Sequence, residues 1–170
     1  MIYATTFKDC INDAVYEMYQ DIPAYEVGSN NIINGVSYNE FLKICQSYME
    51  HETIIDKDIN TTTKRYILYV DDYPVGEVGI RTTLNDFWTN QGSQIFYKIR
   101  LNSRGKGYGN LILKLALKET KKLGFKKVRI NCNDNNIPSK KIIIKNEGIV
   151  DIKKYKTDDG TSSSYIIYLN

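Results

Sequence analysis

The stretch with the clearest chemistry is a glycine-rich loop with basic side chains. Its residues are Arg104, Gly105, Lys106, Gly107, Tyr108, Gly109 and Asn110. The apolar pattern after it has helical spacing, so the loop leads into the N-terminus of a helix. Amides at that end have no partner inside the helix and carry the positive end of its dipole. Glycine leaves such amides uncovered and permits positive φ, so we predict an anion-binding loop.

Three known phosphate-binding patterns do not fit this loop. A Walker loop needs Ser or Thr after its lysine, whereas Gly107 follows Lys106. A dinucleotide fingerprint needs its third glycine one residue later than Gly109. A kinase loop lies within a β-hairpin, but Leu111 and Leu115 continue the helical spacing.

The pattern that does fit is Arg-x-x-Gly-x-Gly, at Arg104, Gly107 and Gly109. This passage resembles the pyrophosphate-binding motif of the GNAT superfamily of acyl-CoA-dependent N-acetyltransferases. A second passage is similar to the Asn-Ile-x-Ser-x-Lys-x-Ile-x-Lys-Asn motif that follows the fifth strand in a bacterial subset of that superfamily. Its matching residues are Asn136, Ile137, Ser139, Lys141, Ile143, Lys145 and Asn146. A third similarity to this subset lies at Gly76, Ile80, Arg81, Leu84 and Asn85.

Two residues depart from the pattern of the superfamily. Glu147 stands where many relatives have a glycine. Ile143 stands where many members have a tyrosine that protonates the departing CoA thiolate. The second departure motivates an alternative in which the protein binds CoA without turnover.

The resemblance implies acetyl-CoA as acyl donor and assigns residues to its binding. The loop amides would hold the pyrophosphate. Backbone groups near the end of the preceding strand would bind pantetheine and the acetyl carbonyl, and the second motif would contribute further contacts. The residues implied outside the loop are Ile99, Arg100, Leu101, Asn136 and Ser139. A preorganised backbone donor at the carbonyl oxygen is worth about 3 kcal/mol or more.

Acetyl transfer to nitrogen also needs proton transfers, because an alkylamine has a pKa of about 10.4. Glu77 and Asp86, which precede the cofactor strand, are the candidate bases. Tyr97 is the candidate proton donor to the thiolate, and Tyr165 and Tyr168 are alternatives.

The acceptor would lie against Arg81, Asn85 and Trp88. Arg81 suits a carboxylate. Glu77 and Arg81 share a strand face. Alternatively, therefore, these two side chains form an ion pair with each other and have no role in the site. Cys132 precedes Asn133 in a predicted buried strand, which favours an inert core thiol over a nucleophile.

The surrounding pattern predicts one domain over residues 1–170. Its class is α+β, an α/β/α sandwich with the GNAT fold: a mixed, mostly antiparallel twisted sheet with a parallel, splayed central strand pair flanked by helices. The predicted helices span residues 7–20, 37–49, 108–122 and 136–146. The predicted strands span residues 61–70, 75–83, 94–100, 125–132, 149–155 and 162–169. We expect the hairpin turns at Asp71–Asp72 and at Asp158–Gly160.

Composition bears on the cellular location of the protein and on its binding partners. The formal net charge is only +3, and Lys114, Lys118, Lys121 and Lys122 read as a solvated helix face. A nucleic-acid-binding protein is therefore the less favoured alternative. The chain has three cysteines, an odd number, and no two of them stand at the short Cys-x-x-Cys spacing. This argues against a disulfide framework and against a metal site. With no apolar run long enough for a membrane span, we expect a cytoplasmic enzyme; the oligomeric state, a homodimer included, stays open.

Overall fold

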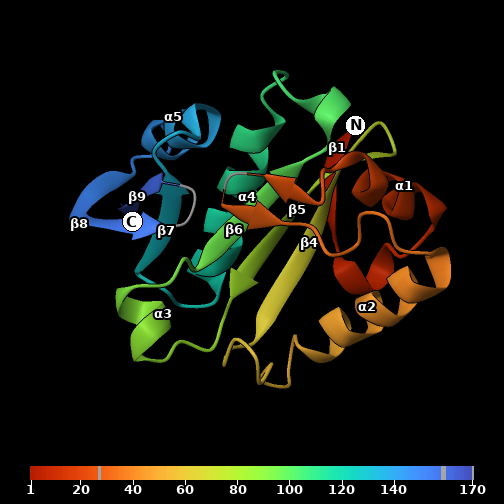
Figure 1. Ribbon diagram of the computed structural model, residues 1–170, viewed down its shortest axis with the longest axis horizontal. Helices are drawn as coiled ribbons and strands as arrows, with labels where there is room; N and C mark the ends of the chain where they lie inside the picture. Colours follow the sequence, from red (N-terminus) through yellow and green to blue (C-terminus); the bar gives the residue numbers. More distant parts are fainter. Residues whose placement is uncertain (27, 158–159, 170) are drawn as a thin grey trace.

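The computed structural model, which describes residues 1–26, 28–157 and 160–169, has two main β-sheets with helices on both faces (Figure 1). The larger sheet contains, in spatial order, β1 (Ile2–Thr6), β4 (Thr63–Val70), β5 (Tyr73–Arg81) and β6 (Ile95–Ile99). The smaller contains β7 (Lys127–Asn133), β9 (Gly160–Tyr168) and β8 (Ile149–Thr157). The helices are α1 (Asp13–Asp21), α2 (Tyr38–Glu50), α3 (Asp86–Asn90), α4 (Tyr108–Lys122) and α5 (Ile137–Lys145). The α/β/α sandwich is confirmed.

Helices α1 and α2 cover one face of the larger sheet. The buried Ile67 and Tyr69 of β4 belong to the same apolar core as Met18 of α1 and Phe41 of α2. Side-chain caps set the starts of both helices: Asn12 accepts a hydrogen bond from the amide of Val15, and Ser37 from that of Glu40. The helix predicted from residue 7 therefore begins only at Asp13, after a separate 3-10 turn at Phe7–Asp9.

Helix α4 lies on the opposite face and contacts both sheets. Leu68 alternates with Ile67 along β4 and faces this second core. Ile112 and Ala116 of α4 are fully buried there, together with Val128 of β7. The core under α4 thus holds the two sheets together.

Tight turns close both predicted hairpins. Asp71 and Asp72 have φ of 49° and 61°, the positive values that a two-residue turn between antiparallel strands requires. Strands β8 and β9 also pair antiparallel, although Asp158 and Asp159 of the predicted turn lie outside the described residues. Strand β1 was not predicted; it pairs with β4 from Ile2↔Val70 to Thr6↔Tyr66.

The expected splay takes the form of a seam between the two sheets. The Gln94 amide donates to the Arg129 carbonyl at 2.8 Å, and the Arg129 amide donates to Gln94 Oε1, also at 2.8 Å. Beyond this point β6 and β7 diverge (Figure 1). We call the diverging part of β6 and β7 the seam, and the Gln94–Arg129 contact its closed end.

Candidate active site

The glycine loop follows a short 3-10 turn, Leu101–Ser103, and opens α4. Gly105 and Gly107 have φ of 76° and 85°, in the left-handed region that favours glycine. A Cβ added at either position would have no atom within 4 Å. The backbone of this loop is therefore uncovered, beside the N-terminal amides of a 15-residue helix.

Gly109 has a different role from the other two glycines. A Cβ there would lie 2.7 Å from Ile142 Cδ1, so its absence lets α5 pack closely on α4. The neighbouring Asn110 supports the same contact, because its Oδ1 accepts a hydrogen bond from Asn146 Nδ2 at 2.9 Å. The third glycine and Asn110 thus join the two motif-bearing helices.

The arginines before the loop are already engaged within the chain. Arg104 forms a two-pronged ion pair with Glu26, Nη1 to Oε1 and Nη2 to Oε2, both at 2.7 Å. Its Nε also donates to the carbonyl of Ile99. Arg100 is buried, and its Nε donates to Asp21 Oδ2 at 2.5 Å. Its backbone amide donates to the Val75 carbonyl of β5. Lys106 instead remains exposed.

A small hollow adjoins the loop on the side of β4 and β5. Its volume is about 310 Å³. The lining residues are Val70, Tyr73, Val75, Asn102, Ser103, Lys106 and Tyr108.

The short hairpin β2–β3 (Tyr25–Glu26 and Ser29–Asn30) contains Glu26, the ion-pair partner of Arg104, and lies beside β6. On β6, Lys98 Nζ donates to the carbonyl of Asn30. On β7, the Cβ of Asn133 lies 3.9 Å from the position that a Cβ of Gly28 would take. The hairpin therefore contacts β6 and lies close to β7, the two strands that border the seam.

Strand β6 turns alternate amides toward the seam. The Arg100 amide donates to the Val75 carbonyl of β5 at 2.9 Å. Successive amides of an antiparallel strand face opposite edges, so the amides of Tyr97 and Ile99 face the seam. These are backbone donors at the place where a thioester carbonyl was expected.

Side chains from three elements meet inside the seam. Tyr97 Oη and Ser139 Oγ are hydrogen-bonded at 2.8 Å, which joins β6 to α5. Burial raises the pKa of Tyr97 to about 12, so the phenol stays protonated at neutral pH. Asn136 caps α5 by accepting from the Ser139 amide. Burial also raises the pKa of the Cys132 thiol, which agrees with an inert core cysteine.

Of the two candidate bases, Glu77 is only 1% exposed and is paired with Arg65, Oε1 to Nη1 at 2.5 Å. Its expected alternative partner, Arg81, lies four residues along β5, about 13 Å away. Asp86 is exposed in the first turn of α3, beyond the end of β5. The structure therefore does not bring the two carboxylates together.

The three predicted acceptor residues do form one cluster. The Arg81 guanidinium lies 4.1 Å from the centre of the Trp88 ring. Asn85 caps α3 by accepting from the Trp88 amide, and Trp88 Nε1 donates to the carbonyl of Ile59 at 2.7 Å. The sequence reasoning missed Phe96, whose Cζ lies 2.1 Å from where a Cβ of Gly79 would be. The signal was Gly79 itself, which leaves room on the strand.

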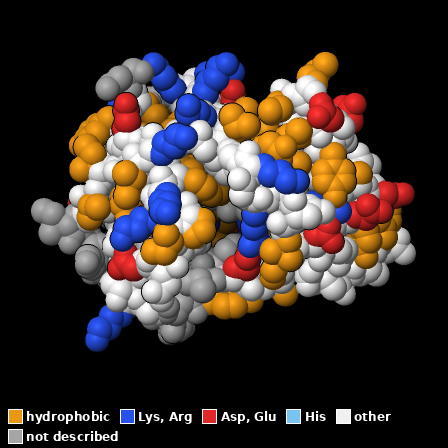
Figure 2. Space-filling view, turned by 90° about the horizontal axis from the view of Figure 1, so that it is seen from above, with side chains coloured by type: hydrophobic (Ala, Val, Ile, Leu, Met, Phe, Trp, Pro, Cys, Tyr) orange, Lys and Arg blue, Asp and Glu red, His pale blue; other side chains and the backbone are white. Residues whose placement is uncertain are grey.

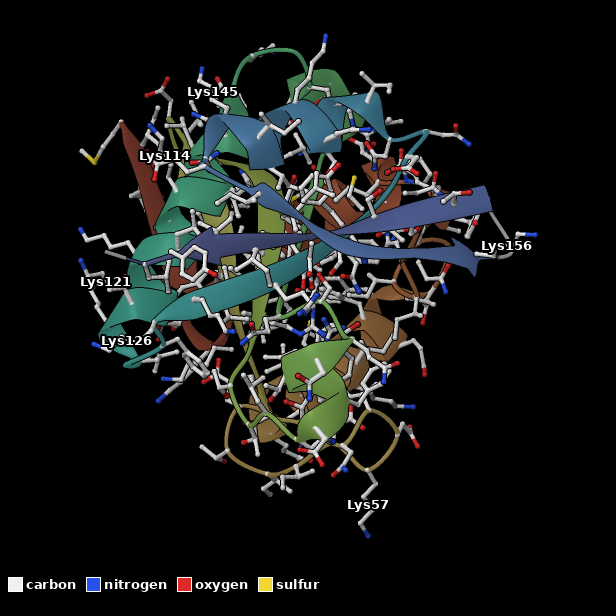
Figure 3. All side chains as sticks on the ribbon, turned by 90° about the vertical axis from the view of Figure 1, so that its left-hand side faces the viewer. Lys57, Lys114, Lys121, Lys126, Lys145 and Lys156 are labelled. Atoms are coloured by element: carbon white, nitrogen blue, oxygen red, sulfur yellow. The ribbon has the colours of Figure 1, made fainter. Side chains whose placement is uncertain are left out.

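Charge is divided unevenly between the two parts of the chain. Residues 1–60 contain ten Asp and Glu against three Lys, whereas residues 61–170 contain ten acidic and twenty basic residues. Acidic side chains accordingly gather toward the end that carries α1 and α2 (Figure 2). The lysines of α4, including Lys114 and Lys121, lie exposed along the opposite side with Lys126 and Lys145 (Figure 3). The lysine stripe is thus a solvated helix face.

The described part of the chain contains neither a membrane-spanning helix nor a metal-binding cluster. No helix there has both the length and the apolar character needed to cross a membrane. No group of three or more His, Cys, Asp or Glu side chains in those residues is arranged to hold a metal ion.

Comparison with known proteins identifies the family. Residues 32–143 match the model of the Acetyltransferase (GNAT) family. A search of curated proteins found no match. The fold is similar to that of a Salmonella typhimurium acetyltransferase that modifies the N-terminal serine of a 50S ribosomal subunit protein, with a TM-score of 0.69, 12% identity and coverage of 99% of this chain and 95% of that one.

It is also similar to Campylobacter jejuni N-acetyltransferase PseH in complex with acetyl coenzyme A, with a TM-score of 0.64, 12% identity and full coverage of both chains. A putative Salmonella typhimurium acetyltransferase with its cofactor acetyl-CoA gives a TM-score of 0.65 at 13% identity, covering 100% of this chain and 94% of that one. At such identities these likenesses concern the fold, whereas the family match covers more than half of the sequence. The chain belongs to the GNAT acetyltransferase family.

Proposed function

We propose that the protein is an N-acetyltransferase that moves the acetyl group of acetyl-CoA to a primary amine of a small molecule or peptide. One observation carries this proposal. The uncovered loop at Gly105 and Gly107 follows directly from the strand whose Tyr97 and Ile99 amides face the seam. An anion site and two backbone donors thereby follow one another along the chain, from β6 to the start of α4.

These residues fit acetyl-CoA, which supplies a reactive thioester when bound. The uncovered backbone of the loop would hold the diphosphate, with Lys106 adding charge. The Tyr97 and Ile99 amides would bind pantetheine and the acetyl carbonyl, beside Ser139. Arg100 suits this role less well, because its amide and side chain are both bonded within the fold.

In the reaction the acceptor nitrogen bonds to the acetyl carbon as the carbon–sulfur bond breaks. The amine gives up a proton, and the thiolate takes one. We assign the second proton to Tyr97, because its phenol lies in the seam and remains protonated. For the first, Asp86 is the freer carboxylate, because Glu77 is held by Arg65.

The test is to incubate the protein with acetyl-CoA and a panel of primary amines while following release of free thiol. Amine-dependent release with formation of the acetylamide is the expected result. Saturable CoA binding without release from any amine would favour the non-catalytic CoA-binding module suggested by Ile143. A nucleic-acid-binding role would instead require strongly salt-dependent affinity through the lysines of α4.

A further inference from the structure

Arg81 differs from the other four arginines in having no acidic partner among the described residues. The chain contains five arginines. Four of them form ion pairs at 2.5–2.7 Å, which are Arg65–Glu77, Arg100–Asp21, Arg104–Glu26 and Arg129–Asp151. Within residues 1–26, 28–157 and 160–169, no carboxylate pairs with Arg81. This part of the chain therefore leaves one guanidinium charge without a counter-ion.

The surroundings of Arg81 hold its guanidinium in one orientation. The rings of Trp88 and Phe96 lie 4.1 and 5.0 Å from its central carbon. Nη1 donates to the carbonyl of Ser93, while Nε is buried and has no hydrogen-bond partner. What remains for a ligand is Nη2, which makes no hydrogen bond within the described residues and is a charged donor that suits a carboxylate oxygen.

An orphan Nε alone would not single out this residue. The Nε atoms of Arg65 and Arg129 also lack partners, but a carboxylate neutralises each of those side chains. Burial and the nearby Arg65 lower the pKa of Arg81 to about 10. The side chain therefore stays charged at neutral pH, although its surroundings destabilise the charge. A half-buried cation without compensation is the kind of group that function, rather than stability, explains.

Arg81 also lies at the right place for the acceptor. Its amide donates to the Gln94 carbonyl at 2.9 Å, so it stands at the closed end of the seam. Tyr97, whose amide faces the expected thioester, is three residues further along β6, about 10 Å from Gln94. By strand alternation Arg81 shares the sheet face of Glu77, which is the face covered by α1 and α2 rather than by α4.

On the basis of the acetyltransferase function proposed above, we propose that Arg81 binds a carboxylate of the acceptor. The acceptors are then amines that also carry a carboxylate, such as amino acids or short peptides. The carboxylate accepts from Nη2 of Arg81 and supplies the missing counter-ion, while the amine points along β6 toward the acetyl group.

The test compares matched acceptors that differ only at the carboxylate. Amino acids and dipeptides are assayed beside their C-terminal amides, with kcat/KM as the readout. The wild-type protein is expected to prefer the acids by about 30-fold or more, the range of a charged hydrogen-bonded contact. Arg81→Gln is expected to reduce this preference to less than about threefold without changing CoA affinity, whereas Arg81→Lys keeps part of it. Lys114→Gln, at an exposed position on α4, is the control and retains the full preference.

A binding experiment tests the carboxylate site independently of acetyl transfer. N-acetylated amino acids and their amides are titrated into the CoA-bound protein by calorimetry. Tighter binding of the acids, lost in Arg81→Gln, supports the carboxylate site even if no amine releases thiol and the proposed function fails. Equal turnover and equal binding of acids and amides by the wild-type protein would overturn the carboxylate site while leaving acetyl transfer intact.

Discussion

At the scale of single residues, the loop glycines allow a matched test of cofactor binding. Gly107→Ala places a methyl group over the loop backbone at φ 85°, and we expect CoA affinity to fall at least about tenfold. Gly124 has φ 88° and equally open surroundings, but lies past the far end of α4. Gly124→Ala should therefore cost a similar 1–2 kcal/mol of backbone strain and leave CoA affinity unchanged. Calorimetric titration and urea unfolding of both variants separate the two effects, and equal CoA affinities would contradict the loop assignment.

Tyr97 permits a test of the proton donor. Tyr97→Phe removes the hydroxyl that bonds Ser139, and we expect kcat to fall about 100-fold with CoA affinity retained. Because its pKa is about 12, the wild-type tyrosine should not cause kcat to decline between pH 7 and pH 10. Tyr165→Phe is the control in the same core. A loss confined to Tyr165→Phe would transfer the role to that residue.

Residue types predicted the cluster at Arg81 and the loop, but not which side chains pair. Glu77 and Arg81 share a strand face, which the alternation of the sequence reveals. Arg65 on the neighbouring strand neutralises Glu77, and this contact depends on strand register. Arg65 stands opposite Gly79, which is two residues from Glu77. Such diagonal contacts between strands have no signature in a single sequence.

At the scale of elements, the hairpin β2–β3 is coupled to the cofactor loop through Arg104. Glu26 occupies the guanidinium that the motif assigns to the cofactor. Glu26→Gln frees Arg104 for the diphosphate, and we expect CoA affinity to rise about two- to fivefold, the effect of one partly exposed ion pair. Glu40→Gln, an exposed change on α2, provides the comparison. Weaker CoA binding by Glu26→Gln would instead show that the ion pair supports the loop.

Elements with strong local signals were predicted well, and elements defined by distant partners were not. Helix α2 begins after Ser37, in agreement with the helix predicted over residues 37–49, and α4 follows its apolar spacing. Strand β1 was not predicted because its partners on β4 lie sixty or more residues away along the chain. Helix α3 is a five-residue segment, too short for a periodic pattern, and its Trp88 is anchored through Ile59.

At the scale of the whole molecule, buried tyrosines predict alkaline unfolding. Burial raises the pKa of Tyr48 and Tyr97 to about 12 each. Between pH 10 and pH 12 the unfolded chain loses these protons and the folded protein keeps them, so stability falls as pH rises. Each group contributes up to about 1.4 kcal/mol per pH unit, reduced where solvent reaches the ring. Urea unfolding at pH 8, 10 and 11 measures the trend, and Tyr97→Phe should make it shallower.

The seam has a consequence for the sheets that border it. The larger and smaller sheets touch through Gln94 and Arg129, and further along β6 the Tyr97 and Ile99 amides face the seam. In the proposed function, pantetheine lies in the seam and accepts hydrogen bonds where a neighbouring strand would otherwise pair with β6. The acyl donor then serves as a temporary strand that completes one continuous sheet, and each departing CoA divides it in two again.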